Sequence, residues 1–303
     1  MLGEALSLLS AASFGLAGAA IAKGAPDARG DNGAFLSIVL TMTFAAVLWI
    51  AAGPNLELAE SGDALVAGVG FFVASGMLAT VLGRLTNFKT VALAGAIRAS
   101  LLRRLIPVFS TLLAVLLLGE RYAVMTVIGM GLILASIGLT MKEKAPAAFG
   151  KFETLSASTI RAGAIFGVIC AFCYALAYIA RKAAMEYIPD AAFGAMVGAV
   201  TGIIWYVFAA PFSAYFRNSL AGLIRDPGPW QWVAAASLSL GQVLLFFALK
   251  YTEVAVVAII GTTEVFVGTY LAAYVFRTEP PPGRYLVAAT ILATIGVVLV
   301  ATS

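Results

Sequence analysis

LILASIG, residues 132–138, recurs as TILATIG at residues 290–296. Earlier in the chain, SFGLA at residues 13–17 is matched by CYALA at residues 173–177. The two pairs are offset by 158 and 160 residues, so the second half of the chain repeats the first. A long internal repeat in an apolar chain is typical of carriers assembled from two related halves, and it organises the interpretation of the whole sequence.

The composition indicates a membrane protein. Hydrophobic residues make up 62% of the 303 residues and charged residues 11%, with a mean hydropathy of +1.00. Soluble domains carry about 25% charged residues, and runs of about 20 apolar residues are long enough to cross a bilayer. We therefore predict an all-α integral membrane protein with ten transmembrane helices, at residues 2–22, 33–53, 70–93, 99–118, 122–141, 161–180, 190–211, 230–250, 255–276 and 284–302.

The number of spans in each half sets the relation between the halves. A half that crosses the membrane five times ends on the opposite face, so the second half must be inverted relative to the first. We expect one five-helix repeat over residues 1–141, a linker over residues 142–160, and a second five-helix repeat over residues 161–303. Inverted repeats are typical of alternating access, in which one central site opens to each side in turn.

Several classes of function are disfavoured by what the chain lacks. It contains no histidine, which removes histidine general bases, Ser-His triads and histidine metal ligands. We predict no catalytic residue, no cofactor and no metal. The net charge of +4 is small and scattered, without a basic arm for nucleic acid. The expected partners are a small-molecule substrate and the lipid bilayer, with protons as a candidate coupling ion, in a monomer or weak dimer.

Basic residues inside the expected spans are the first functional signal. Residues 64–119 contain five Lys or Arg and no acid. Arg84 lies near the middle of the expected third span, and Asn87 shares its helix face. An arginine at the centre of a membrane helix costs about 2.5–3.5 kcal/mol on insertion scales, so Arg84 requires a protein partner, water or a ligand.

Arg103 and Arg104 lie about one turn inside the expected fourth span, and their role stays open between two interpretations. In the first, they extend to the membrane interface together with Lys89 and Arg98. In the second, one of them joins Arg84 at a cavity that binds a carboxylate or a phosphate.

Glu264 is the clearest acid within a span. It could pair with an arginine of the other half, or it could take up a proton, because burial favours the neutral form of a carboxylate. Side-chain amides within spans usually have a specific hydrogen-bond partner, so Gln242 is also a candidate site residue. A polar and aromatic lining is completed by Tyr174, Phe246 and Tyr270.

Short motifs carry a resemblance to a known family. GAIRAS at residues 95–100, PVF at 107–109, LGE at 118–120 and Gly129 resemble the pattern of the drug/metabolite transporter superfamily, in its EamA-type ten-helix branch. In the second half Glu279 matches Glu120, but Phe266 stands where the pattern has proline, and Thr278 where it has glycine. The resemblance covers essentially the whole chain.

The resemblance implies two inverted five-helix repeats, a central cavity shared between them, and transport of small organic metabolites. Bacterial members often export amino acids or related compounds. Arg98 and Glu120 belong to the motif and are therefore expected to serve the architecture. Selectivity for the substrate is expected to depend on residues outside the motif, namely Arg84, Asn87, Gln242 and Glu264.

The orientation in the membrane is predicted differently by charge and by family. The positive-inside rule would place both termini outside, because Lys and Arg gather after the odd-numbered spans, at Lys23, Arg29, Lys142, Lys144, Lys151, Arg161, Arg217, Arg225, Arg277 and Arg284. The resemblance implies cytoplasmic termini, and we prefer that orientation.

The resulting hypothesis is a secondary transporter in the cell inner (plasma) membrane that exports an amino acid or another carboxylate-bearing metabolite. Arg84, with Arg103 or Arg104, would bind the anionic group, Asn87 and Gln242 would orient it, and Tyr174, Phe246 and Tyr270 would contact its apolar part. Glu264 would couple a proton or balance the arginines. Two alternatives stay open: a proton-coupled carrier of lipophilic cations or drugs that uses Glu264, and a membrane enzyme acting on a lipid-linked substrate.

Overall fold

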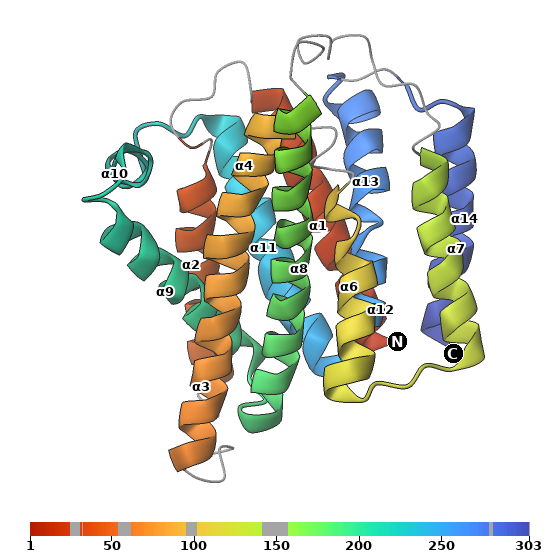
Figure 1. Cartoon of the computed structure of the whole chain (residues 1–303), viewed down its shortest axis with the longest axis horizontal. Helices are drawn as coiled ribbons and strands as arrows, with labels where there is room; N and C mark the ends of the chain where they lie inside the picture. Colours follow the sequence, from red (N-terminus) through yellow and green to blue (C-terminus); the bar gives the residue numbers. More distant parts are fainter. Residues whose placement is uncertain are drawn as a thin grey trace.

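The protein is a bundle of helices standing side by side (Figure 1). The computed structural model describes residues 1–24, 31, 33–53, 62–94, 102–140, 157–278 and 281–302. All regular structure in these ranges is helical, which confirms the predicted class. Eight of the described helices are long and apolar enough to cross a membrane, and two shorter apolar helices cover residues 106–118 and 124–136.

The first half contains α1 (Leu2–Gly24), α2 (Ala34–Ala52), α3 (Gly62–Gly76), α4 (Arg84–Ala94), α6 (Ile106–Leu113) and α7 (Val124–Thr140). A π-helical stretch, Met77–Gly83, joins α3 to α4 into one long rod. A second π-helical stretch, Ala114–Leu118, continues α6. Local π-helical turns of this kind often occur near functional sites.

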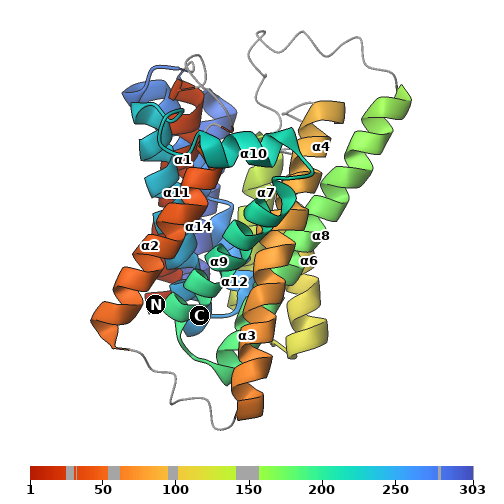
Figure 2. The same cartoon turned by 90° about the vertical axis from the view of Figure 1, so that its left-hand side faces the viewer.

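The second half contains α8 (Ala157–Tyr187), α9 (Ala191–Ala209), α10 (Ala214–Ala221), α11 (Pro229–Tyr251), α12 (Val254–Gly261), α13 (Glu264–Tyr270) and α14 (Arg284–Thr302). α13 continues as a π-helical stretch over Leu271–Val275. α10 is a short helix that follows α9 and lies across one end of the bundle (Figure 2).

Four expected spans differ clearly from the structure: the third, the fourth, the sixth and the ninth. The third begins at Gly62 rather than residue 70, and the ninth is interrupted between Gly261 and Glu264. The sixth is much longer than residues 161–180, because α8 continues through Arg181 and Lys182. The expectation that these two residues begin a loop is wrong. Both are solvated by protein groups of other helices, so their charges do not force the chain out of the bundle.

Pro107 also has a different role from a kink inside one long helix. In the described part of the fourth span a turn at residues 104–105 precedes α6, and Pro107 lies in the first turn of that helix. Proline is well accommodated there because the first-turn amides have no helical acceptor. The break therefore lies next to Arg103 and Arg104.

The packing partners of the two halves are reciprocal. α1 packs along α11 and α13, whereas α8 packs along the α3–α4 rod and α6. α2 pairs with α9, and α7 pairs with α14 at one side of the bundle (Figure 1). The largest buried cluster lies where α3, α8, α9, α11 and α12 meet, and it includes Phe72, Ile188, Phe246 and Leu249.

Glycines allow the closest helix crossings. A Cβ on Gly76 would lie 2.9 Å from the carbonyl oxygen of Gly198, on α9. A Cβ on Gly129 of α7 would lie 2.7 Å from the carbonyl oxygen of Gly296 on α14, and the reverse distance is also 2.7 Å. Any larger residue at these positions must push the helices apart, as expected for small-residue packing in membranes.

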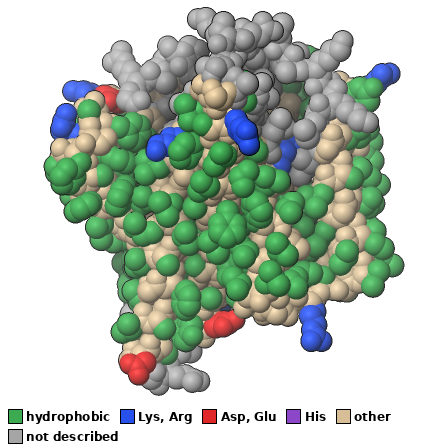
Figure 3. All heavy atoms as spheres, viewed as in Figure 1, with side chains coloured by type: hydrophobic (Ala, Val, Ile, Leu, Met, Phe, Trp, Pro, Cys, Tyr) green, Lys and Arg blue, Asp and Glu red, His purple; other side chains and the backbone are tan. Residues whose placement is uncertain are grey.

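The surface has an apolar middle and charged ends. Hydrophobic side chains cover most of the face seen in Figure 3, and the charged side chains lie near its upper and lower edges, basic ones mostly at the upper edge and acidic ones mostly at the lower edge. Both termini lie at the lower end of the bundle (Figure 1).

Candidate substrate cavity

Two helix breaks lie on the same cavity. One is the turn at residues 104–105 before α6, and the other is the interruption at Thr262 and Thr263 between α12 and α13. α6 packs against α12, which brings the breaks together. Interrupted membrane helices are tolerated where the freed backbone is buried in protein or lines a cavity. The breaks place Arg103 and Arg104 on one wall and Glu264 on another.

The cavity has a volume of about 250 Å³ and is lined by residues of α1, the α3–α4 rod, α6, α8, α11, α12 and α13. A smaller cavity of about 90 Å³ adjoins it and shares Arg84, Arg181 and Gln242 in its lining. The charged residues that line the larger cavity are Arg84, Arg103, Arg104, Arg181 and Glu264.

The charges of this lining are unbalanced. Four guanidinium groups face one carboxylate. The ion pairs between two described residues join the N-terminal amine of Met1 to Glu4 and Arg225 to Asp226, and neither lies in the cavity. The lining therefore carries an excess positive charge, which is the arrangement that attracts and holds anions.

Arg84 and Arg103 are held by neutral groups. Arg84 Nη1 donates to the carbonyl oxygen of Ala34, at the start of α2, over 3.1 Å. Arg103 is exposed within the cavity, and its guanidinium carbon lies 5.9 Å from the centre of the Tyr174 ring. A hydrogen bond to a carbonyl oxygen and a cation–π contact orient a guanidinium without neutralising it, so these contacts leave both groups able to bind an anion.

Arg181 comes from the part of α8 that was expected to be a loop. It is only 4% exposed and lies between the rings of Phe246 and Tyr178, at 4.6 and 5.6 Å. With its amide oxygen turned toward the guanidinium, Gln242 accepts from Arg181 Nη1 and Nη2 at 3.1 and 3.0 Å. Gln242 thus has the specific partner that its position in a span predicted.

The predicted site residues divide into two groups. Arg84, Arg103, Arg104, Tyr174, Gln242 and Glu264 line the larger cavity, and Phe246 lines the smaller one. Asn87 and Tyr270 are not part of either lining. The Tyr270 ring stacks on Tyr274 at 6.1 Å, and its hydroxyl accepts from Thr290 of α14 at 3.4 Å. Tyr270 therefore serves packing against α14, and a contact with substrate is not supported.

The sequence interpretation missed Arg181 as a site residue. The available signal was spacing, because Tyr174, Tyr178 and Arg181 fall at positions i, i+4 and i+7 of one helix face. Tyr178 and Arg181 were separated only because the charge pair Arg181-Lys182 was taken as the end of the span.

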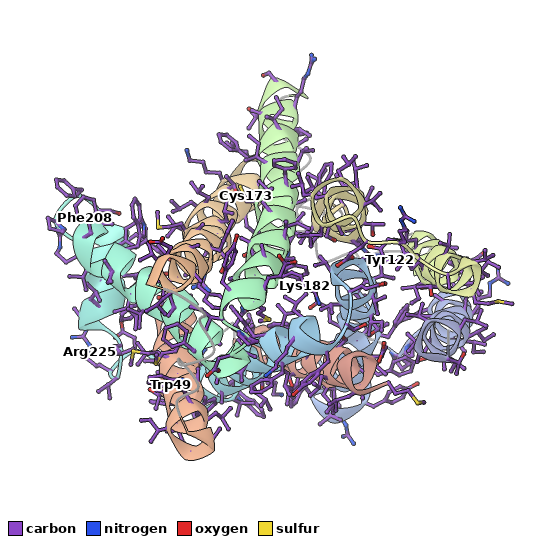
Figure 4. The ribbon with its side chains drawn as sticks, turned by 90° about the horizontal axis from the view of Figure 1, so that it is seen from below. Trp49, Tyr122, Cys173, Lys182, Phe208 and Arg225 are labelled. Atoms are coloured by element: carbon purple, nitrogen blue, oxygen red, sulfur yellow. The ribbon has the colours of Figure 1, made fainter. Side chains whose placement is uncertain are left out.

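Glu120 helps to join helix ends at the end of the bundle that carries the termini. Its carboxylate accepts from the backbone amide of Val254, at the start of α12, over 2.9 Å, and from the hydroxyl of Tyr122. Lys182 Nζ donates to the carbonyl oxygens of Leu249 and Thr252, at the end of α11, over 2.9 Å each. Lys182 lies on the inner side of α8 and Tyr122 in the turn before α7 (Figure 4). This network supports the architectural role expected for Glu120.

Glu253 lies beside this network, between α11 and α12. Burial raises the pKa of its carboxyl group, and the nearby Glu120 carboxylate raises it further, while Lys182 acts in the opposite direction. The pKa of Tyr122 is raised as well, by burial and by its hydrogen bond to Glu120. Glu120 and Glu253 therefore lie close to each other where α6, α7, α11 and α12 meet, with Lys182 beside them.

The model of the EamA-like transporter family matches residues 1–142 and again residues 161–302. The chain belongs to the EamA-like transporter family. This transporter is thus a multi-pass membrane protein of the drug/metabolite transporter kind, with a small molecule as its substrate. Arg98 and Glu279, which carry part of the family motif, lie outside the described residues.

A solved structure described only as a crystal structure of a protein is similar to the transporter over nearly its full length. The TM-score is 0.68 at 17% identity, covering 98% of this chain and 96% of the other. At this identity the likeness shows the fold alone. No curated protein matched the sequence.

Proposed function

We propose that this transporter is a secondary carrier that exports a small carboxylate-bearing metabolite, such as an amino acid, across the cell inner membrane. The observation that carries the proposal is the excess of guanidinium groups over carboxylates in the cavity lining. A carboxylate matches the planar donor fork of arginine in two parallel hydrogen bonds. An anionic substrate would thereby offset the cost of holding these charges away from bulk water.

The ten-helix inverted architecture and alternating access belong to the same proposal. Reciprocal packing of α1 with α11 and of α8 with the α3–α4 rod supports two related halves. The breaks before α6 and between α12 and α13 occur at matching places of the repeat and on one cavity. A central site flanked by interrupted helices from both halves is the arrangement that rocking carriers use.

The cavity supports specific roles for its residues. Arg84 and Arg103 bind the anionic group, and the Tyr174 ring beneath Arg103 contacts the apolar part of the substrate. Gln242 holds Arg181 in place. Glu264 balances the arginines or takes up the coupling proton. The transporter works as a monomer or weak dimer.

Counterflow into liposomes tests this function. Liposomes that contain the purified transporter are loaded with unlabelled amino acids or with mono- or dicarboxylates, and uptake of the same labelled compound from outside is followed. We expect exchange of at least one organic anion, and its loss in Arg103→Gln. Lys89→Gln is the matched control, because Lys89 is an exposed basic residue that contacts Phe166 outside the cavity. Failure of the whole panel to exchange would contradict the substrate class.

The cation-carrier alternative has less support. A lipophilic cation bound at Glu264 would share the cavity with four guanidinium groups. Like charges at close range in a water-poor cavity repel strongly. Exchange of quaternary ammonium compounds without any exchange of organic anions would favour this alternative.

A further inference from the structure

Arg181 is a buried guanidinium without a counter-charge. The side chain is 4% exposed, and its Nε has no hydrogen-bond partner among the described residues. Its terminal nitrogens donate to the neutral amide oxygen of Gln242. No ion pair between described residues includes it.

A purely structural role does not account for this arrangement. Burying an unpaired charge is costly, and an amide oxygen and two ring faces compensate for only part of the lost hydration. Leucine or methionine would fill the space between Phe246 and Tyr178 at a lower cost. A ligand that brings an anionic group to Arg181 would supply the missing charge.

The second cationic position is set by α8 itself. Arg103 lies over Tyr174 and Arg181 lies over Tyr178, and both tyrosines line the cavity. Residues four apart on a helix are about 6 Å apart along its axis. The rings that support the two guanidinium groups thus come from positions one turn apart on α8, a spacing that a short carbon chain can bridge.

The number of charges agrees with this geometry. Arg84, Arg103 and Arg181 bring three guanidinium groups to the lining and Glu264 brings one carboxylate, so these four residues have a net charge of +2. A monoanion would balance half of this charge, whereas a dianion would balance all of it. Protonation of Glu264 would increase the excess and strengthen the preference for a dianion.

We infer that the cavity selects a small metabolite with two anionic groups at opposite ends, of the dicarboxylate class. One group binds Arg103 with Arg84, and the other binds Arg181, which Gln242 positions. Arg181 is therefore the residue that distinguishes dianions from monoanions. The inference rests on the proposed function, and it narrows the substrate from any carboxylate to a dianion.

Binding to purified transporter tests the inference with straight-chain dicarboxylates of three to six carbons and with the monocarboxylates of the same lengths. The wild type is expected to bind its best dicarboxylate at least about tenfold more tightly than the matched monocarboxylate, since each charge-assisted contact contributes about that factor. Arg181→Gln should remove this preference by weakening the binding of dicarboxylates. Arg181→Lys should restore part of it. Arg161→Gln, an exposed arginine at the other end of α8, should change nothing.

Gln242→Glu gives a second test, in which the Arg181 side chain is retained. The new carboxylate would lie against both terminal nitrogens of Arg181 and form an internal ion pair, so the fold is retained. Dicarboxylate binding should then fall to the monocarboxylate level, although Arg181 is still present. A merely structural Arg181 would leave the preference unchanged in this variant.

The outcomes separate the two claims. The inference would be overturned if the wild type bound dicarboxylates and monocarboxylates equally, or if the preference for dicarboxylates survived both Arg181→Gln and Gln242→Glu. The proposed function would still stand in either case, provided that the transporter exchanges monocarboxylates. Absence of binding and exchange for every organic anion would overturn the proposed function as well.

Discussion

Charged side chains in this transporter are hydrogen-bonded to helix ends. Lys182 donates to carbonyl oxygens at the end of α11, where the helix dipole is negative, and Glu120 accepts from the first amide of α12, where it is positive. Arg84 instead uses the carbonyl oxygen of Ala34. These contacts satisfy hydrogen-bonding capacity in a medium that offers little water.

Glu264→Gln tests the role of the single acid in the cavity. The change removes a negative charge from a lining rich in arginine, so organic anions should bind at least as tightly as to the wild type. Accumulation driven by a pH gradient should be lost if Glu264 takes up the coupling proton. Binding is measured on purified protein and accumulation in liposomes with an imposed gradient. Loss of anion binding together with retained cation uptake would contradict the anion assignment.

Because of Glu253, we expect the stability of the folded protein to depend on pH. Its pKa in the folded state is raised above the ordinary value of 4.5, chiefly by burial and then by Glu120. The folded state therefore favours the protonated form, and this contribution is complete below pH 4.5 and lost as the pH rises through the raised pKa.

The melting temperature of purified Glu253→Gln should accordingly equal that of the wild type at low pH and exceed it increasingly as the pH rises. Glu186→Gln, which changes an exposed acid of α8, is the control and should follow the wild-type curve. A constant difference between Glu253→Gln and wild type at all pH values would contradict the assignment.

At the level of elements, the segment that carries Glu264 is positioned by a glycine contact. Gly15 of α1 packs directly against the start of α13, where a Cβ would lie 2.7 Å from the carbonyl oxygen of Glu264 and 2.8 Å from the amide of Gly268. Both contacts are with backbone, which cannot move aside as a flexible side chain can. α1 thus holds α13 at the distance that the cavity requires.

Gly15→Ala should displace α13, lower the stability by about 1–3 kcal/mol, as overpacking does, and reduce transport. Gly18→Ala is a close control on the same helix, because a Cβ on Gly18 meets nothing within 4 Å. Melting temperature and counterflow are measured for both variants. Equal effects of the two substitutions would show that helix propensity, and not the crossing, is responsible.

At the scale of the whole molecule, the two ends differ in charge. The end opposite the termini carries seven basic residues, Lys23, Lys89, Arg161, Arg217, Arg225, Arg277 and Arg284, against the acids Asp31 and Asp226. The other end carries six acids, Glu4, Asp63, Glu120, Glu186, Asp190 and Glu253, against the basic residues Arg121, Lys182 and Lys250. Basic residues are retained on the cytoplasmic side. The structure thus strengthens the charge argument over the family orientation, and we expect both termini to lie outside.

Cysteine labelling decides the orientation. With Cys170 and Cys173 replaced, Glu186→Cys should react with a membrane-impermeant maleimide in intact cells, and Arg217→Cys only after permeabilisation. Both positions are exposed, at opposite ends of the bundle. The reverse pattern would show the family orientation.

Much of the fold could be predicted from the sequence, while the site could be predicted only in part. The boundaries of α14 and α11 agree within one residue, because the apolar runs end at charged or proline-rich turns. The break at Thr262 was not predicted, since the helix that faces it, and not the local sequence, stabilises it. The packing of Tyr270 against α14 could not be predicted, because an aromatic stripe does not reveal which neighbour it faces.

The sequence by itself determined that this protein is a helical membrane transporter with a repeated architecture. Helix length, apolar content and repetition are properties of local stretches, and the cost of exposing a peptide group to lipid makes them decisive. Only the tertiary structure decided that Arg181 belongs to the cavity. Its burial depends on Gln242 and Phe246, about 60 residues away on α11, and the energy of a buried charge is set by the groups that the fold brings to it.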